Sequence, residues 1–218
     1  MSLFTRLKAN TLDLLTPTLR WFMLGMVLAN IAGTMVYTFL PVYLNELHAT
    51  VEQIGLVYSL ASLVPLVLQV FGGWMSDTIG RLRTIAIGSG ISCIGYLGFW
   101  LAPSWEWILI SLGIEYISSS MVGPSYAAFV AEQSKEEQRG RLFGLTDSIF
   151  MIVAVVGGPL GGLLAGRLGY KSLYLVAMVF YLLASVLRIR MAVQVRRASP
   201  TAGQPLSFAG LRSKVGVM

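Results

Sequence analysis

Six long apolar segments constrain the fold of this chain more than any other feature. Each has close to the ~20 residues that a helix needs to cross ~30 Å of hydrocarbon. Backbone amides find no water inside a bilayer, so segments of this length are expected to be helices. Barrel strands would instead alternate over ~10 residues, and the sequence shows no such pattern. The six expected spans are Trp21–Leu44, Ile54–Ser76, Thr84–Ala102, Trp105–Ala131, Leu142–Gly166 and Ser172–Leu187.

Composition supports an all-α integral membrane protein embedded in a lipid bilayer. Only 12% of the 218 residues are charged and 56% are hydrophobic, whereas soluble domains carry roughly a quarter charged residues. The net charge of +6 fits basic cytoplasmic loops, not nucleic-acid binding. Cys93 is the lone cysteine and His48 the lone histidine, and we find no catalytic set, metal-ligand cluster or cofactor motif. The sequence therefore predicts neither an enzyme nor a metal or cofactor site.

The distribution of basic residues predicts the orientation. With the N-terminus in the cytoplasm, 14 of the 16 lysines and arginines lie inside, and only Arg167 and Lys171 lie outside. This asymmetry is the positive-inside pattern. Short loops and the absence of a cleavable signal favour a multi-pass protein of the bacterial cytoplasmic membrane, with both termini cytoplasmic. At the end of the sixth and shortest span, Arg188 and Arg190 are expected to extend toward the interface.

Three regions are expected along the chain. Residues 1–20 form a cytoplasmic N-terminal segment that lies at the interface, and residues 21–191 form the six-helix bundle. Residues 192–218, rich in Ser, Pro, Thr, Gly and Arg, form a cytoplasmic linker. An even number of spans followed by a basic linker predicts that a second membrane half, missing from this chain, belongs to the protein.

Glycines repeat at a constant offset of 89 residues. Gly72-Gly73 and Gly80 recur as Gly161-Gly162 and Gly169. The first set falls at the end of the second span and the other at the end of the fifth, on opposite sides of the membrane. We therefore predict two three-helix units with inverted topology, as in many transporters.

The turn between the second and third spans carries a charged motif: Gly73, Asp77, Gly80, Arg81 and Arg83. Asp77 and Arg81 are close enough to pair across the turn, and Gly80 permits a tight backbone. An alternative is that the two arginines only anchor the helix to anionic lipid.

This motif resembles the signature between helices 2 and 3 of the major facilitator superfamily. The resemblance implies one half of a transporter in which two six-helix bundles rock around a midplane site. It also implies that the cluster latches the halves in one state, with Glu132 as a further acidic partner.

A second motif lies on the fifth span and consists of Gly157, Gly158, Pro159, Gly161 and Gly162. It resembles the helix-5 motif of drug/proton antiporters of the same superfamily, with one residue instead of two between the proline and the glycine pair. Small residues four apart form a groove for a neighbouring helix, so ordinary helix packing is the alternative. The proline can kink the span.

Glu115 is the leading candidate for proton coupling or substrate contact. It lies about ten residues, or ~15 Å, into the fourth span, where a carboxyl exposed to lipid is costly and must face protein or a cavity. Desolvation there opposes ionisation, which suits a proton-coupling group. The alternative is a structural glutamic acid bonded to Ser118 or Ser119. Further candidates are Asn30 and Tyr37 on the first span, Gln69 on the second, and Asp147, for which an interfacial role is the alternative.

These observations predict a secondary active transporter of small organic solutes that works by alternating access, with proton-coupled drug efflux preferred. Two alternatives stay open. One is an importer of sugars or metabolites from the same superfamily, and the other is a truncated membrane scaffold that transports nothing.

Overall fold

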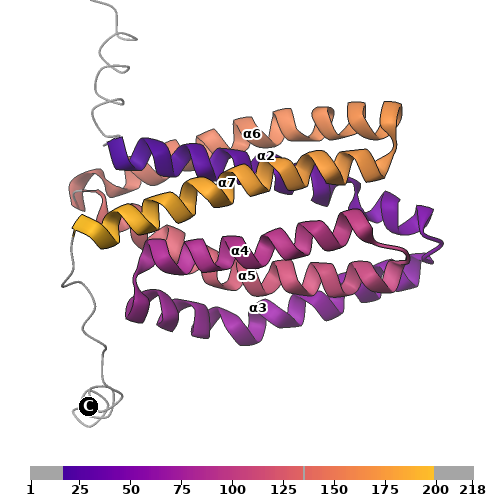
Figure 1. The fold of residues 1–218 in the computed structure, drawn as a ribbon, viewed down its shortest axis with the longest axis horizontal. Coiled ribbons are helices and arrows are strands. Elements are labelled where there is room, and N and C mark those ends of the chain that lie inside the picture. Colours follow the sequence, from indigo (N-terminus) through magenta and orange to yellow (C-terminus); the bar gives the residue numbers. More distant parts are fainter. Residues whose placement is uncertain (1–16, 135, 199–218) are drawn as a thin grey trace, which may run out of the picture.

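The structure, a computed structural model, describes residues 17–134 and 136–198. Six long α-helices run side by side along the molecule (Figure 1). The expected interfacial segment up to residue 16 and the linker from residue 199 onward lie outside the described residues. The elements are α2 (Pro17–Glu46), α3 (Val51–Ile79), α4 (Arg81–Leu101), α5 (Trp105–Glu132), the short 3-10 helix η1 (Glu136–Gln138), α6 (Arg139–Leu168) and α7 (Tyr170–Ala198).

The helices form two layers of three (Figure 1). In one layer α2 packs against both α6 and α7, and in the other α5 packs against both α3 and α4. The layers meet mainly where α4 packs against α7. Helices that follow one another in the chain are therefore often not the closest partners, and the central contact joins the third and sixth long helices.

Among the described residues, five helical stretches are long and apolar enough to cross a membrane. They are Pro17–Glu46, Val51–Ile79, Arg81–Leu101, Glu136–Leu168 and Tyr170–Gln194. The sequence predicted six spans, and α5 is the one that the composition of the helix does not identify. Its 28 residues match the others in length, but it buries Ser111, Ser118, Ser120 and Ser125 against its neighbours. Small polar side chains at a helix interface lower hydropathy while they allow close packing.

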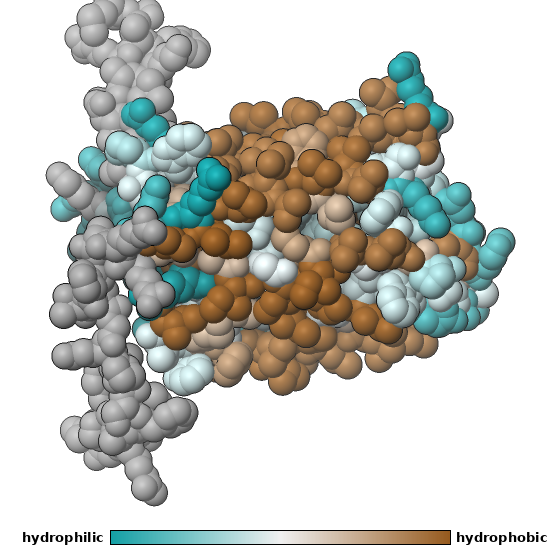
Figure 2. All heavy atoms as spheres, in the orientation of Figure 1, coloured by the Kyte–Doolittle hydropathy of each residue, from teal (hydrophilic) through white to brown (hydrophobic). Residues whose placement is uncertain are grey.

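On the face seen in Figure 2, the bundle is mostly apolar in its middle and polar toward its ends. The most exposed large side chains lie on α3 and α6, including Leu66, Val70 and Val155. A soluble protein rarely exposes a continuous apolar surface of this extent. The band therefore fits the hydrocarbon core of a bilayer.

Single glycines join α3 to α4 and α6 to α7. Gly80 has φ 99° and Gly169 has φ 81°, a region that residues with a Cβ rarely adopt. The amide of Gly80 donates to Ser76 O over 3.2 Å, and that of Gly169 donates to Ala165 O over 3.0 Å. The two turns share one backbone arrangement and lie at opposite ends of the bundle (Figure 1).

Helix α7 continues to Ala198, eleven residues beyond the end expected from the apolar run. Arg188 therefore lies inside the helix and is only 2% exposed. The prediction that Arg188 extends to the interface was wrong. Its side chain is held inside the bundle by the polar groups of two other helices, described below.

Candidate functional site

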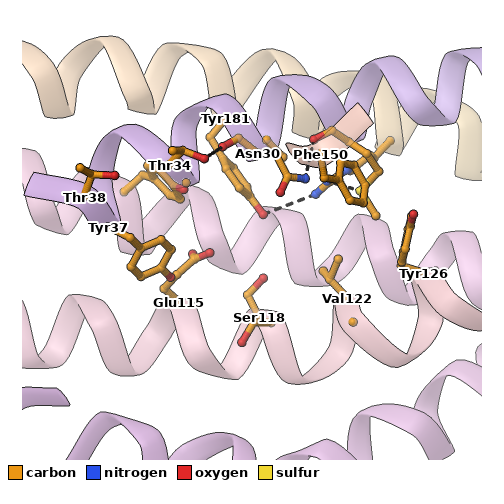
Figure 3. Close-up of a pocket in the computed structure, with 17 residues that line it drawn as sticks. Asn30, Thr34, Tyr37, Thr38, Glu115, Ser118, Val122, Tyr126, Phe150 and Tyr181 are labelled. Carbon is orange, nitrogen blue, oxygen red and sulfur yellow. Dashed lines mark hydrogen bonds between the residues drawn. The ribbon is translucent and has the colours of Figure 1, made fainter. Parts of the chain in front are cut away.

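A cavity of about 560 Å³ lies between the two layers of helices (Figure 3). Pockets for drug-sized ligands measure roughly 300–1,000 Å³, so one small organic molecule fits this volume. The cavity is lined by Met26, Ala29, Asn30, Gly33, Thr34, Tyr37 and Thr38 of α2, Tyr96 of α4, Glu115, Ser118, Ser119, Val122, Gly123 and Tyr126 of α5, Phe150 of α6, and Tyr181 and Arg188 of α7.

Glu115 contributes the carboxyl group of the cavity. It is 7% exposed, and its Oε2 atom has no hydrogen-bond partner among the described residues. A Cβ on Gly95 of α4 would lie 3.5 Å from Oε2, an ordinary van der Waals distance, so this part of α4 lies beside the carboxyl group. The carboxyl group thus lies between α4 and the cavity.

The two serines expected to satisfy Glu115 bond elsewhere. Ser118 donates to Gly88 O over 2.7 Å and accepts from Ser92 over 2.6 Å. Ser119 donates to Tyr116 O over 3.0 Å. A purely structural glutamic acid would be expected to have its oxygens satisfied, so the open Oε2 favours a functional role for Glu115.

Arg188 contributes the positive charge of the cavity. Its Nη1 donates to Ser89 Oγ on α4 over 2.8 Å and to Tyr181 OH over 3.4 Å, and Nη2 donates to Met26 Sδ on α2 over 2.8 Å. Its guanidinium also lies 5.8 Å from the centre of the Tyr181 ring, within the range of a cation–π contact. All of these partners are neutral. No carboxylate lies within ion-pair distance of Arg188 in the described part of the chain, which is unusual for a buried charge.

Aromatic side chains cover the walls between the two charged groups. Tyr96 and Tyr181 stack at 4.4 Å between ring centres, and Tyr126 lies 5.6 Å from Phe150. Tyr37 lies close to Glu115 on the opposite wall (Figure 3). Flat apolar rings with a few fixed polar groups are typical of small-molecule sites.

The other predicted contact residues divide into two groups. Asn30 lines the cavity together with Tyr37, although its amide nitrogen donates to Met26 O over 2.9 Å on its own helix. Gln69 and Asp147 are exposed and do not line the cavity. Gln69, the candidate from the second span, therefore lies outside this site. A buried cavity residue that sequence reasoning missed is Arg188, although Tyr174, Tyr181 and Arg188 recur seven residues apart on α7, the spacing of one helix face.

The charged motif gathers at one end of the bundle, away from the cavity. Arg81 at the start of α4 forms an ion pair with Asp77 and donates from Nε to Glu132 Oε1 over 2.9 Å. Its Nη1 also donates to Ser76 Oγ over 3.1 Å. One guanidinium thus connects α3, α4 and α5. Arg83, on another side of the helix, is partly buried.

The two adjacent glycines near the end of α3, Gly72 and Gly73, have different surroundings in the structure. A Cβ on Gly72 would overlap the carbonyl oxygen of Ser120 on α5, whereas a Cβ on Gly73 would meet nothing within 4 Å. Gly72 is therefore the residue that lets α3 and α5 touch. Gly73, the motif position, has no packing reason to be glycine.

The glycine motif of α6 faces α2. A Cβ on Gly157 would lie 2.8 Å from Thr34 Cβ, and one on Gly161 would lie 2.9 Å from the Phe39 ring. A Cβ on Gly162 would lie 3.2 Å from the same ring, whereas one on Gly158 would meet nothing within 4 Å. Pro159 lies inside α6, which continues through it as one helix. Three of the four glycines therefore serve helix packing in this structure.

Apolar helices arranged around a cavity with one buried carboxyl and one buried guanidinium are the architecture of a helical membrane protein. The chain belongs to the Major Facilitator Superfamily, whose family model matches residues 22–216.

Two relatives have names that refer to drug resistance. The chain is 24% identical over 172 residues to the quinolone resistance protein NorA of Staphylococcus aureus (strain Mu50 / ATCC 700699), which covers 79% of this chain and 44% of that protein. Identity and coverage are the same for multidrug resistance protein 1 of Bacillus subtilis (strain 168). The chain thus spans less than half of the length of these curated relatives.

Solved structures share the fold. A peptide transporter POT in complex with sulfate aligns with a TM-score of 0.68 at 16% identity, covering 91% of this chain and 42% of that one. The POT family transporter PepTSo aligns with a TM-score of 0.65 at 17% identity, covering 79% and 37%. At these identities the likeness concerns the fold alone.

Proposed function

We propose that this chain is one six-helix half of a secondary active transporter that exports small organic solutes in exchange for protons. The observation that carries the proposal is the pair of buried ionisable groups, Glu115 and Arg188, facing one cavity inside an apolar bundle. Ionisable residues inside a membrane protein are costly and usually mark a transport path. The names of the two bacterial relatives favour drug-like organic solutes over sugars or metabolites.

Alternating access requires two related units, and the packing supports a 3+3 inverted repeat. An offset of 89 residues places α2 on α5, α3 on α6 and α4 on α7. Under this pairing, each contact in one unit has a counterpart in the other. The contact of α2 with α6 corresponds to that of α5 with α3, and the contact of α2 with α7 corresponds to that of α5 with α4. The central contact of α4 with α7 maps onto itself. The two positive-φ glycine turns at opposite ends fit the same symmetry.

The proposal also covers the orientation in the membrane, the charged cluster and the second half of the transporter. The end that carries Arg81, Arg83, Arg139 and Arg141 faces the cytoplasm of a bacterial cell, by the positive-inside rule. The cluster of Arg81 with Asp77 and Glu132 latches the two halves in one state and releases in the other. The second half of about six helices covers the apolar faces that lipid does not.

Glu115 is the proposed proton site. A proton and a solute that carries positive charge would compete for its open carboxyl group, which couples their movements in opposite directions. The charged and titratable groups that line the cavity with it are Tyr37 of α2, Tyr96 of α4, Tyr126 of α5, and Tyr181 and Arg188 of α7.

The test uses the complete transporter, in which this chain is combined with the proposed second half, in proteoliposomes with a pH gradient and a fluorescent cationic drug such as ethidium. We expect gradient-driven transport that Glu115→Gln reduces by at least tenfold. The matched control is Glu106→Gln, the same substitution on an exposed position of the same helix, which should retain transport. Equal transport by both variants would contradict the proton role of Glu115.

The same assay separates the alternatives. Uptake of sugars or metabolites with the gradient, and no movement of the drug, would favour the importer. No transport of either class by a folded full chain would favour the scaffold. Transport by 218 residues alone would require two copies to supply the opposite wall.

A further inference from the structure

The charges that line the cavity have opposite signs and are held apart. Glu115 projects from α5 and Arg188 from α7, which belong to opposite layers of the bundle. Neither forms an ion pair within 4.0 Å among the described residues. The cavity therefore contains one acidic and one basic side chain that form no direct ion pair.

Arg188 and Glu115 are held differently within the cavity. Ser89 on α4 accepts a hydrogen bond from Arg188 over 2.8 Å, whereas Oε2 of Glu115 has no hydrogen-bond partner among the described residues. The guanidinium is therefore fixed by neutral groups, and the carboxyl group is open to the cavity that both residues line.

Charge balance then selects the ligand. A buried charge without a counter-ion is strongly unfavourable. A ligand that is only a cation would pair with Glu115 and leave Arg188 uncompensated beside a new positive charge. A ligand that is only an anion would leave Glu115 in the same position. A molecule with both charges compensates the two groups at once.

We propose that this cavity binds zwitterionic aromatic molecules, with the ammonium group at Glu115 and the carboxylate at Arg188. The rings of Tyr37, Tyr126, Phe150 and Tyr181 would contact the aromatic body of the ligand. This inference rests on the proposed function in that the ligand is the transported solute. It goes beyond that function by naming the charge type of the solute and a distinct role for Arg188.

The test measures equilibrium binding to the full chain in lipid nanodiscs, with no gradient. The probe is a naphthalene ring that carries an aminoethyl and a carboxyethyl chain. Three derivatives keep the same body: the methyl ester is only a cation, the N-acetyl compound is only an anion, and the N-acetyl ester is neutral. We expect the zwitterion to bind at least tenfold more tightly than each of the others, the scale of one charged hydrogen bond.

Variants of the protein assign each charge to its site. In Arg188→Gln the zwitterion should lose at least tenfold in affinity, and the ester should bind more tightly than before because no uncompensated positive charge remains. In Glu115→Gln the zwitterion should lose affinity by a similar factor, and the N-acetyl compound should bind more tightly than before. Arg188→Lys, which keeps the charge, should retain part of the preference for the carboxylate even if Arg188→Gln fails to fold.

Two results would overturn the inference. One is a zwitterion that binds no more tightly than its ester, and the other is no binding of any compound up to its solubility limit. Transport failure alone would not affect it, because binding is measured without transport. Conversely, drug transport by a chain that prefers simple cations would leave the proposed function intact and refute the zwitterion.

Discussion

At the scale of single residues, Arg81 concentrates several contacts in one side chain. It pairs with Asp77 on α3 and Glu132 on α5, whose side chains are 55% and 53% exposed. Ion pairs this exposed contribute about 1 kcal/mol or less to stability. The cluster therefore contributes little to the stability of the bundle, and it is weak enough to open, as the proposed latch requires.

Replacement of Arg81 separates a latch from a lipid anchor. We expect Arg81→Ala to lower the transport rate by about tenfold or more while the free energy of unfolding changes by about 1 kcal/mol or less. The control is Arg83→Ala, since Arg83 belongs to the same motif but forms no ion pair among the described residues. Initial rates in proteoliposomes and thermal melting in detergent provide the measurements. Equal losses in both variants would favour membrane anchoring as the common role.

Glu115 and Arg188 show what residue-level reasoning on the sequence can and cannot find. A carboxyl in the middle of an apolar span is conspicuous because its cost is local, and Glu115 was predicted and does line the cavity. Arg188 follows an apolar run, and its position depends on how far α7 continues. The length of α7 depends on its packing against α2 and α4. The local sequence does not show these contacts between distant segments.

At the scale of helices, two adjacent glycines of α3 have different roles in packing. Gly72 lies against the backbone of α5, whereas its neighbour Gly73 faces open space. In the sequence these two glycines form one pair of the 89-residue repeat and look equivalent. Which of the two is essential depends on the rotation of α3 about its axis, and no hydrophobic pattern fixes that rotation for a helix whose exposed side chains are also apolar.

We expect Gly72→Ala to destabilise the protein by about 1–3 kcal/mol, the usual cost of forcing extra volume into a packed interface. Gly73→Ala is the matched control and should change stability by less than about 0.5 kcal/mol. Thermal denaturation of both variants in detergent measures the difference. Similar melting temperatures for the two variants would show that α3 and α5 are not in close contact at Gly72.

At the scale of the whole molecule, the topology follows from quantities that sum over long segments. Run lengths predict helices, and the bias of lysine and arginine predicts which ends face the cytoplasm. The cavity could not be predicted in this way. Its walls come from five helices, and small rotations of each decide whether Tyr181 or a neighbouring leucine faces inward.

Cysteine labelling in intact bacteria tests the orientation. In a Cys93→Ser background, we expect Glu52→Cys to react with a membrane-impermeant maleimide from outside. We expect Glu137→Cys to react only after the cells are permeabilised, because it lies at the end that carries most of the basic residues. Both positions are exposed, so access to the reagent depends on the side of the membrane. The reverse pattern would invert the orientation proposed for the bundle.

The single-glycine joints at Gly80 and Gly169 have a consequence for engineering this chain. A joint of one residue has no slack, so an inserted tag or reporter domain there would pull apart two helices that the backbone holds in fixed register. The chain between Glu132 and Arg139 is longer and its described residues are mostly exposed. Fusion partners for imaging or crystallisation therefore belong between α5 and α6, and not at the tight turns.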